Sequence, residues 1–145
     1  MVLAHFGHNH TETELRQLLD TQPSGTRARN TMSIANLGFN VELRSSGLSQ
    51  LRQALAAGVP PIVFIDTGPL DYWQIDCAHA AVVVGIEDDL VFLHDPFFDD
   101  APRRTSLTSF LTAWALNAHL TAILRPRVTQ KKIPPPGSKK KRRKR

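Results

Sequence analysis

The chain has 145 residues, 41% of them hydrophobic, which is enough for one domain with a single core. No apolar run is long enough to span a bilayer, and the chain does not begin with a basic segment followed by a long apolar stretch. Neither a transmembrane helix nor a secretory signal is therefore predicted. The only cysteine, Cys77, excludes an intrachain disulfide and is compatible with a reducing, cytoplasmic compartment.

Charge divides the chain into two parts. Residues 131–145 hold nine Lys or Arg residues and no acid, whereas residues 1–130 hold the other nine with all 13 acidic residues, about −4 in total. Three consecutive prolines and the run of like charge predict a disordered tail over 127–145. Such a tail would bind nucleic acid or an anionic membrane by charge, and a solubilising extension is the other interpretation. The residues in question are Lys139, Lys140, Lys141, Arg142, Arg143, Lys144 and Arg145.

Three helices are predicted at the start of the chain. Their ranges are 1–6, 11–20 and 27–37. The first is interpreted as the closing turns of a helix that would begin upstream of Met1, ended by Gly7. Thr11 and Glu14 have the spacing of a capping box, and Gly38 is expected to stop the third helix. The apolar residues of the third helix expected to face the core are Met32, Ile34, Ala35 and Leu37.

The remainder of the body is predicted to contain most of the sheet. Expected strands cover 39–43 at an edge, 60–65, 79–85, 90–95 and 119–124. A short helix ended by Gly58 follows the first strand, and a second helix covers 106–115 with Trp114 on its buried face. Because helices come first and strands mostly later, the fold class predicted is α+β.

Two of the predicted strands carry the most informative residues. His79 opens one strand and Asp95 closes the next, so antiparallel pairing through the turn at 87–89 would bring them to the same end of the sheet. An imidazole gains an orienting carboxylate in this way. Cys77 is a poor candidate for their nucleophile, because residues two apart on a strand stand parallel and well separated.

Other residues allow more than one interpretation. His5, His8 and His10 have short spacings that suit zinc, but exposed histidines in a polar turn are the simpler interpretation, and no metal or cofactor site is expected.

Tyr72 and Trp73 either line a peptide cleft or pack in the core. Phe97 and Phe98 are expected to plug the bottom of the domain, with Asp99 and Asp100 in solvent. His94 is expected to point away from Asp95. No phosphate-cradling loop is present.

The order of these features resembles the papain-like, bacteriocin-processing peptidase domain, family thirty-nine of the cysteine peptidases, which cuts leader peptides after a double glycine. The matching segments are Met1–Gly7, Thr11–Leu15, Pro23–Thr26, Asn36–Phe39, Leu51–Gly58, Pro61–Val63, His79–Gly85 and Asp95–Pro96. The resemblance implies a papain-like fold over 1–126, with N-terminal helices packed on an antiparallel sheet and the basic tail over 127–145 outside it.

The resemblance also implies catalytic roles. His79 would be the general base and Asp95 its orienting partner, while the nucleophilic cysteine and the oxyanion glutamine would lie upstream of Met1. Because the thiolate is the reactive species, residues 1–145 alone are expected to lack peptidase turnover. A longer active enzyme is one interpretation. The other is a non-catalytic peptide-binding or regulatory module whose basic tail binds nucleic acid or an anionic membrane.

Overall fold

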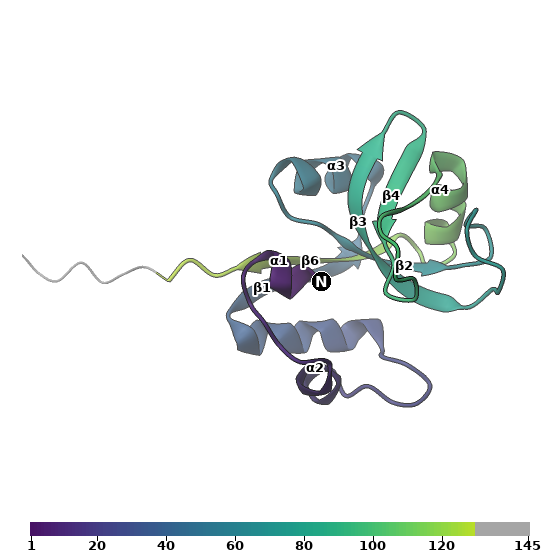
Figure 1. Cartoon of the computed structure of the whole chain (residues 1–145). Coiled ribbons are helices and arrows are strands. Elements are labelled where there is room, and N and C mark those ends of the chain that lie inside the picture. The colour runs from purple at the N-terminus through teal and green to yellow at the C-terminus, as the bar shows by residue number, and fades with distance from the viewer. Residues whose placement is uncertain (130–145) are drawn as a thin grey trace, which may run out of the picture.

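The computed structural model describes residues 1–129 of the chain. It contains a six-stranded sheet of antiparallel pairs in the order β1-β6-β2-β3-β4-β5, with most of the helices preceding the strands along the chain (Figure 1). The α+β class predicted from the sequence is therefore confirmed. The basic cluster at 139–145 lies outside the described residues. Within 1–129, no helix is both long enough and apolar enough to cross a bilayer.

Five of the six strands match predicted segments. The strands are β1 (Phe39–Ser45), β2 (Ile62–Asp66), β3 (Ala78–Glu87), β4 (Leu90–His94), β5 (Arg103–Ser106) and β6 (Leu120–Pro126). β1 is an edge strand, as its alternation predicts. β5 is the strand that the sequence analysis missed. It has four residues, two of them arginines, and it pairs only with β4 at the other edge of the sheet.

The helices begin and end close to the predicted residues. They are α1 (Val2–His5), α2 (Glu12–Leu18), the 3₁₀ helix η1 (Ala28–Leu37), α3 (Leu48–Ala56) and α4 (Leu107–Ala115). The capping box is confirmed, since the Glu14 amide donates to Thr11 Oγ1 at 3.1 Å and the Thr11 amide donates to Glu14 Oε2 at 2.8 Å. Gly38 ends η1 with a φ of 88°, a conformation that side chains disfavour.

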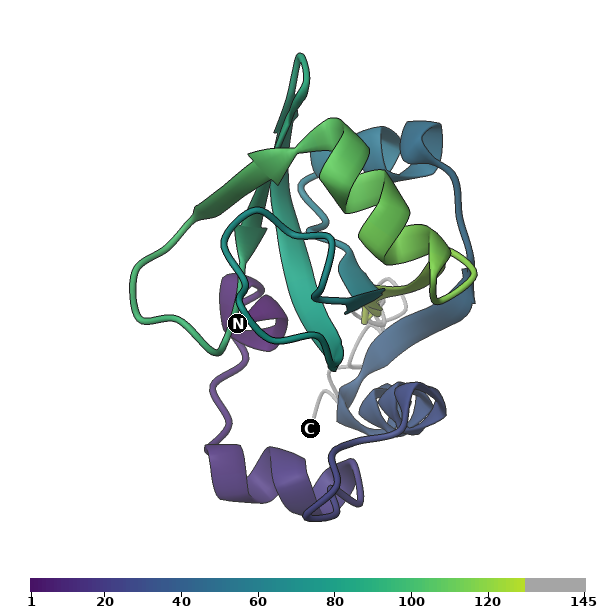
Figure 2. The same cartoon turned by 90° about the vertical axis from the view of Figure 1, so that its right-hand side faces the viewer.

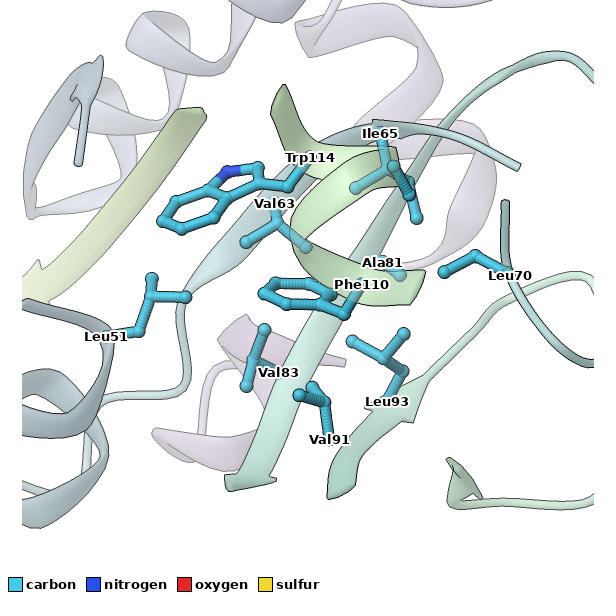
Figure 3. Close-up of a cluster of buried hydrophobic side chains, with 11 residues drawn as sticks. Leu51, Val63, Ile65, Leu70, Ala81, Val83, Val91, Leu93, Phe110 and Trp114 are labelled. Atoms are coloured by element: carbon cyan, nitrogen blue, oxygen red, sulfur yellow. The ribbon is translucent and has the colours of Figure 1, made fainter. Parts of the chain in front are cut away.

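One face of the sheet packs against α4 and part of α3. Phe110 and Trp114 of α4 stack at 5.5 Å between ring centroids and lie over the central strands (Figure 3). The side chains from the central strands that complete this core are Val63, Ile65, Ala81, Val83, Val91 and Leu93. Burial of Trp114 on this face confirms the helical stripe predicted over 106–115.

The other face of the sheet packs against α1, α2 and η1, which lie on the opposite side from α4 (Figures 1 and 2). Val2 and Leu3 of α1 meet Val82 of β3 there, together with Ile34 of η1. Burial of Ile34 agrees with the prediction, but Met32 is 46% exposed, so its predicted burial is wrong. The 3₁₀ geometry accounts for this, because three residues per turn move the buried stripe relative to an α-helix.

Candidate functional site

His79 and Asp95 lie against each other at one end of the sheet. His79 is the second residue of β3, and Asp95 follows the last residue of β4. The imidazole Nε2 is 2.7 Å from Asp95 Oδ1. The Asp95 side chain is fully buried and that of His79 is 17% exposed, so the pair is shielded from solvent but its imidazole remains accessible.

A β-bulge determines which face of the sheet the aspartate occupies. Near the turn Gly85 pairs with Phe92, whereas Val83 pairs with Leu93, so the register shifts by one residue. Directly paired residues share a face, and side chains alternate along each strand. Continuing the shifted register therefore puts both residues of the pair on one face, the face that α4 covers. The unshifted register would put them on opposite faces.

The Asp95 carboxylate accepts four hydrogen bonds. Oδ1 accepts from His79 and from the Phe97 amide at 3.0 Å, while Oδ2 accepts from the Tyr72 hydroxyl and from the Trp73 indole N–H, both at 2.9 Å. Burial by itself raises the pKa of Asp95. The hydrogen bonds from Trp73, Phe97 and His79 outweigh burial, so the net pKa of Asp95 is lowered.

The protonation state of the pair follows from this lowered pKa. An ionised carboxylate only accepts hydrogen bonds, so Nε2 of His79 must carry the proton between them. In the neutral imidazole the other nitrogen, Nδ1, then keeps its lone pair. Among residues 1–129, Nδ1 has no hydrogen-bond partner. The arrangement can therefore accept a proton at Nδ1 while Asp95 stabilises the imidazolium that forms.

The loop between β2 and β3 supplies both donors to Oδ2, and it is fixed at two points. The Asp71 carboxylate accepts from the Thr105 hydroxyl at 2.8 Å, the Ser106 amide at 2.7 Å and the Ser109 hydroxyl at 2.9 Å, which joins the loop to the end of β5 and the first turn of α4. These hydrogen bonds, that of the Ser106 amide first, lower the pKa of Asp71. Near β3, the Thr67 hydroxyl donates to the Ile75 carbonyl at 2.6 Å.

The family model of the Peptidase C39 family matches residues 1–125. The chain belongs to this family. The family resemblance drawn from the sequence is thereby confirmed, and a peptide is the class of substrate that a peptidase family implies. The comparison with curated proteins gave no match.

Two crystal structures of C39 peptidases share the fold. One is the peptidase domain of Streptococcus ComA, a bifunctional ABC transporter involved in a quorum-sensing pathway, with a TM-score of 0.69 and 24% identity over 87% of this chain and 85% of that one. The other is a C39-like peptidase from Bacillus anthracis, with a TM-score of 0.59 and 14% identity over 71% of this chain and 60% of that one. At these identities the likeness shows the fold, which is that of a C39 peptidase domain.

The side chain of Cys77 contacts Thr67 and not His79. Cys77 is exposed, and its sulfur lies 3.6 Å from the Thr67 hydroxyl. Its backbone amide also donates to that hydroxyl at 2.9 Å. Thr67 thus holds Cys77 at the base of the loop, and within the described residues the sulfur has no hydrogen bond to His79.

The other histidines lie apart from the pair. His5 Nε2 bonds the Gly58 carbonyl at 2.9 Å, His8 packs edge-on against Phe39 and His10 lies beside Glu14. Among residues 1–129, no group of three or more His, Cys, Asp or Glu side chains is placed to hold a metal ion. His94 pairs with Val82 and lines a cavity beside α1, on the face of the sheet opposite the pair.

An aromatic cluster borders the site in a way that the sequence did not reveal. Trp73 lies edge-on to His79 with 5.0 Å between ring centroids, and it contacts Phe97 at 4.7 Å and Phe98 at 5.2 Å. Phe97 is 67% exposed, so the prediction that it plugs the domain is wrong. Its ring lies against Trp73 and Phe98 at the surface of this cluster and does not enter the core. Phe98 packs on Tyr72, under the Arg103 guanidinium.

Two apolar hollows flank the start of α1. One, of about 460 Å³, lies between α1, the end of α3 and the β3–β4 hairpin, and it includes Val84. The other, of about 210 Å³, lies between α1, α2, η1 and β3. Its lining includes Met1, Ala80 and Pro96, and the last two are chain neighbours of His79 and Asp95. The second hollow therefore lies near the same end of β3 as the pair, but on the opposite face of the sheet.

Proposed function

We propose that this C39 domain serves in thiol-dependent cleavage of peptides, of the leader-processing type. His79 acts as general base and Asp95 orients it. The observation that carries this proposal is the 2.7 Å contact between Nε2 and the buried carboxylate, which leaves Nδ1 able to accept a proton. Family membership supports a peptide as the substrate.

The chemistry assigns each proton to a named atom. Nδ1 of His79 takes the thiol proton, and the thiolate attacks the scissile carbonyl carbon to form a tetrahedral oxyanion. The intermediate collapses to a thioester as the imidazolium returns that proton to the leaving amine. Water then loses a proton to Nδ1, attacks the thioester and releases the acid and the thiol. Asp95 remains ionised throughout and stabilises the imidazolium.

In this proposal the thiol and the oxyanion-binding glutamine come from a segment outside residues 1–145, upstream of Met1. Cys77 is the chain's only cysteine, and its sulfur lies 3.6 Å from the Thr67 hydroxyl. The apolar hollow beside α1, which includes Ala80 and Pro96 and lies on the opposite face of the sheet from the pair, offers a surface on which such a segment could pack. Residues 1–145 alone should therefore not turn peptide over.

The test compares residues 1–145 with a longer protein that includes the residues encoded in frame upstream. Both are assayed for cleavage of a fluorogenic peptide with a double glycine before the scissile bond. Only the longer protein should cleave it. In that protein His79→Ala should abolish turnover, whereas the Cys77→Ala variant should remain active. Cleavage by residues 1–145, or loss of cleavage on Cys77→Ala, would contradict the assignment of the thiol.

The second candidate is a non-catalytic peptide-binding or regulatory module whose basic tail binds a polyanion. The absence of any thiol but Cys77 and the nine basic residues of 131–145 favour it. Binding to DNA or to anionic vesicles should weaken steeply with added salt and disappear when residues 139–145 are removed. Affinity that does not change with salt would count against this candidate. A stop codon in frame just upstream would favour it over the first.

A further inference from the structure

Two donors to the Asp95 carboxylate come from outside the His79–Asp95 pair. The Tyr72 hydroxyl and the Trp73 indole N–H both reach Oδ2 at 2.9 Å, from adjacent positions in one loop. Neither donates to Oδ1, which is left to His79 and to the Phe97 amide. The two carboxylate oxygens are thus assigned to different partners.

We propose that Tyr72 and Trp73 are positioning residues of the site, which fix the carboxylate plane of Asp95 so that Oδ1 holds the His79 imidazole with Nδ1 available for proton transfer. This inference rests on the function proposed above, since positioning matters only if the imidazole moves a proton. It assigns the two aromatics to the catalytic machinery, whereas the sequence left them between cleft lining and core packing.

Rotation of the carboxylate is the freedom that these donors remove. The terminal torsion of an aspartate is soft, and one hydrogen bond to each oxygen leaves several orientations open. The Asp95 side chain is fully buried, so water has little access to replace a missing donor at Oδ2. Two donors converging on Oδ2 therefore determine where Oδ1 lies, and the position of Oδ1 determines the position of the imidazole.

The two aromatics act on the histidine by different routes. Trp73 also contacts the imidazole edge-on, at 5.0 Å between centroids and 61° between planes, so it limits ring tilt directly. Tyr72 reaches the histidine only through Asp95, and Arg103 lies 5.7 Å from its ring. The charged and titratable groups that these contacts place around the carboxylate are thus His79, Tyr72 and, through the phenol ring, Arg103.

The loop is built to hold both donors in place. The carboxylate of Asp71, directly before them, accepts three hydrogen bonds, from Thr105 and Ser106 at the end of β5 and from Ser109 in α4. Both rings pack against Phe98, with 5.3 Å between the centroids for Tyr72 and 5.2 Å for Trp73. Anchoring on the far side of the loop keeps the donors from following the carboxylate if it turns, which is what a positioning role requires.

The test follows the ring N–H proton of His79 by NMR in the full chain, residues 1–145. The signal is assigned by its loss in His79→Asn. A proton held between imidazole and carboxylate exchanges slowly with water. Trp73→Phe and Tyr72→Phe should each accelerate its exchange about tenfold, the effect of one hydrogen bond to a charged group, and the double variant should accelerate it further.

Two control variants separate positioning from packing. Phe98→Leu removes the ring that packs on both aromatics but removes no donor, and Trp114→Phe makes the same chemical change in the core. Trp114→Phe should leave the exchange rate unchanged, and Phe98→Leu should accelerate exchange less than either donor variant, because both hydrogen bonds to Oδ2 and the Asp71 anchor remain. Unchanged exchange in the folded donor variants, or equal acceleration in Phe98→Leu, would overturn the proposal. Tyr72→Phe removes a single oxygen, so it decides the question if Trp73→Phe does not fold.

This readout does not depend on turnover. If the longer protein fails to cleave peptides but exchange accelerates as expected, the proposed function fails and the geometric role of the two aromatics stands. If the longer protein cleaves peptides and exchange is unchanged, the peptidase assignment stands and the positioning role fails.

Discussion

The two sides of the site are held together by different forces. Around Asp95, a buried charge is satisfied by four directional hydrogen bonds, and the loop that supplies two of them is itself fixed by Asp71. At the start of α1 the surface is apolar, with two hollows and with Met1 53% exposed. Hydrogen bonds impose one geometry, whereas apolar contact is non-directional and accepts any surface of suitable shape.

The difference indicates which half of the site keeps its geometry without a further segment of chain. The Asp95 carboxylate receives all four of its hydrogen bonds from within residues 1–129, so the geometry of the His79–Asp95 contact does not require a thiol to be present. The α1 side is suited to a partner that arrives by packing. Five expected outcomes bear on this contrast, from the largest effect to the smallest.

The largest effect is expected from removing the carboxylate. Asp95→Ala leaves four donors without an acceptor in a buried site, which should lower the free energy of unfolding by about 3–5 kcal/mol. Urea denaturation measures it. The control is Asp99→Ala, an exposed aspartate four residues further on, which should change stability by less than about 0.5 kcal/mol. Equal effects would mean that the hydrogen bonds to Asp95 do not organise this side.

The decline of the unfolding free energy at low pH should depend on the same carboxylate. The pKa of Asp95 is lower in the folded chain than in the unfolded one, because the hydrogen bonds outweigh burial. Its contribution to stability is therefore present above about pH 4, the unfolded value, and is lost as pH falls through the folded pKa. Asp95→Asn should flatten the decline of unfolding free energy below that pH. An unchanged slope would assign the decline to other carboxylates, Asp71 among them.

Much of this organisation could be predicted from the sequence. Strand periodicity and a short acidic turn placed His79 and Asp95 at one end of two adjacent strands, and the structure brings them into contact. Which face of the sheet would carry Asp95 was harder to predict. A regular hairpin would have put the aspartate on the other face, and only the bulge between Val83 and Gly85 corrects it. Bulges depend on packing of both strands, and a lone glycine in a strand is a weak sign of one.

The donors to Oδ2 could not be predicted, for a different reason. Tyr72 and Trp73 lie in a loop whose path is determined by Asp71, more than 30 residues before its partners Thr105 and Ser106. Local sequence patterns contain no information about such a contact. A tyrosine and a tryptophan side by side, each with an apolar ring and one donor, were the available signal.

A smaller effect is expected in the titration of Tyr72. Burial first, and then the charge of Asp95, raises the pKa of the phenol well above its usual value. Tyr72 is the only tyrosine, so absorbance near 295 nm reports it alone. In Asp95→Asn the titration should move back toward about pH 10, the usual value. A midpoint that does not move would assign the whole shift to burial and would separate Tyr72 from the charged half of the site.

The raised pKa of Tyr72 has a consequence for stability in alkali. A group whose folded pKa lies above its unfolded one contributes stability below the unfolded value and loses it as pH rises toward the folded value. Stability should therefore decline above about pH 10, and Tyr72→Phe should remove that part of the decline. Denaturation in urea at pH 9 and pH 11 measures it, and an identical decline in both proteins would contradict the expectation.

The smallest effect is expected on the apolar side, and its sign should depend on what fills the hollow. Ala80 of β3 lines the hollow of about 210 Å³ beside α1. Ala80→Val adds two methyl groups there and should raise the stability of residues 1–145 by about 0.5–1 kcal/mol. Ala78→Val, on the same face of the same strand but exposed, should gain less, because it adds strand propensity alone.

In the longer protein of the proposed function, the same substitution should act in reverse. If that segment packs into the hollow, valine overfills it, and Ala80→Val should lower stability and slow peptide cleavage while Ala78→Val changes neither. The comparison of the two proteins by thermal unfolding and by cleavage rate measures this change of sign. Stabilisation in both would mean that the hollow stays unfilled, and the thiol would then have to approach His79 by another route.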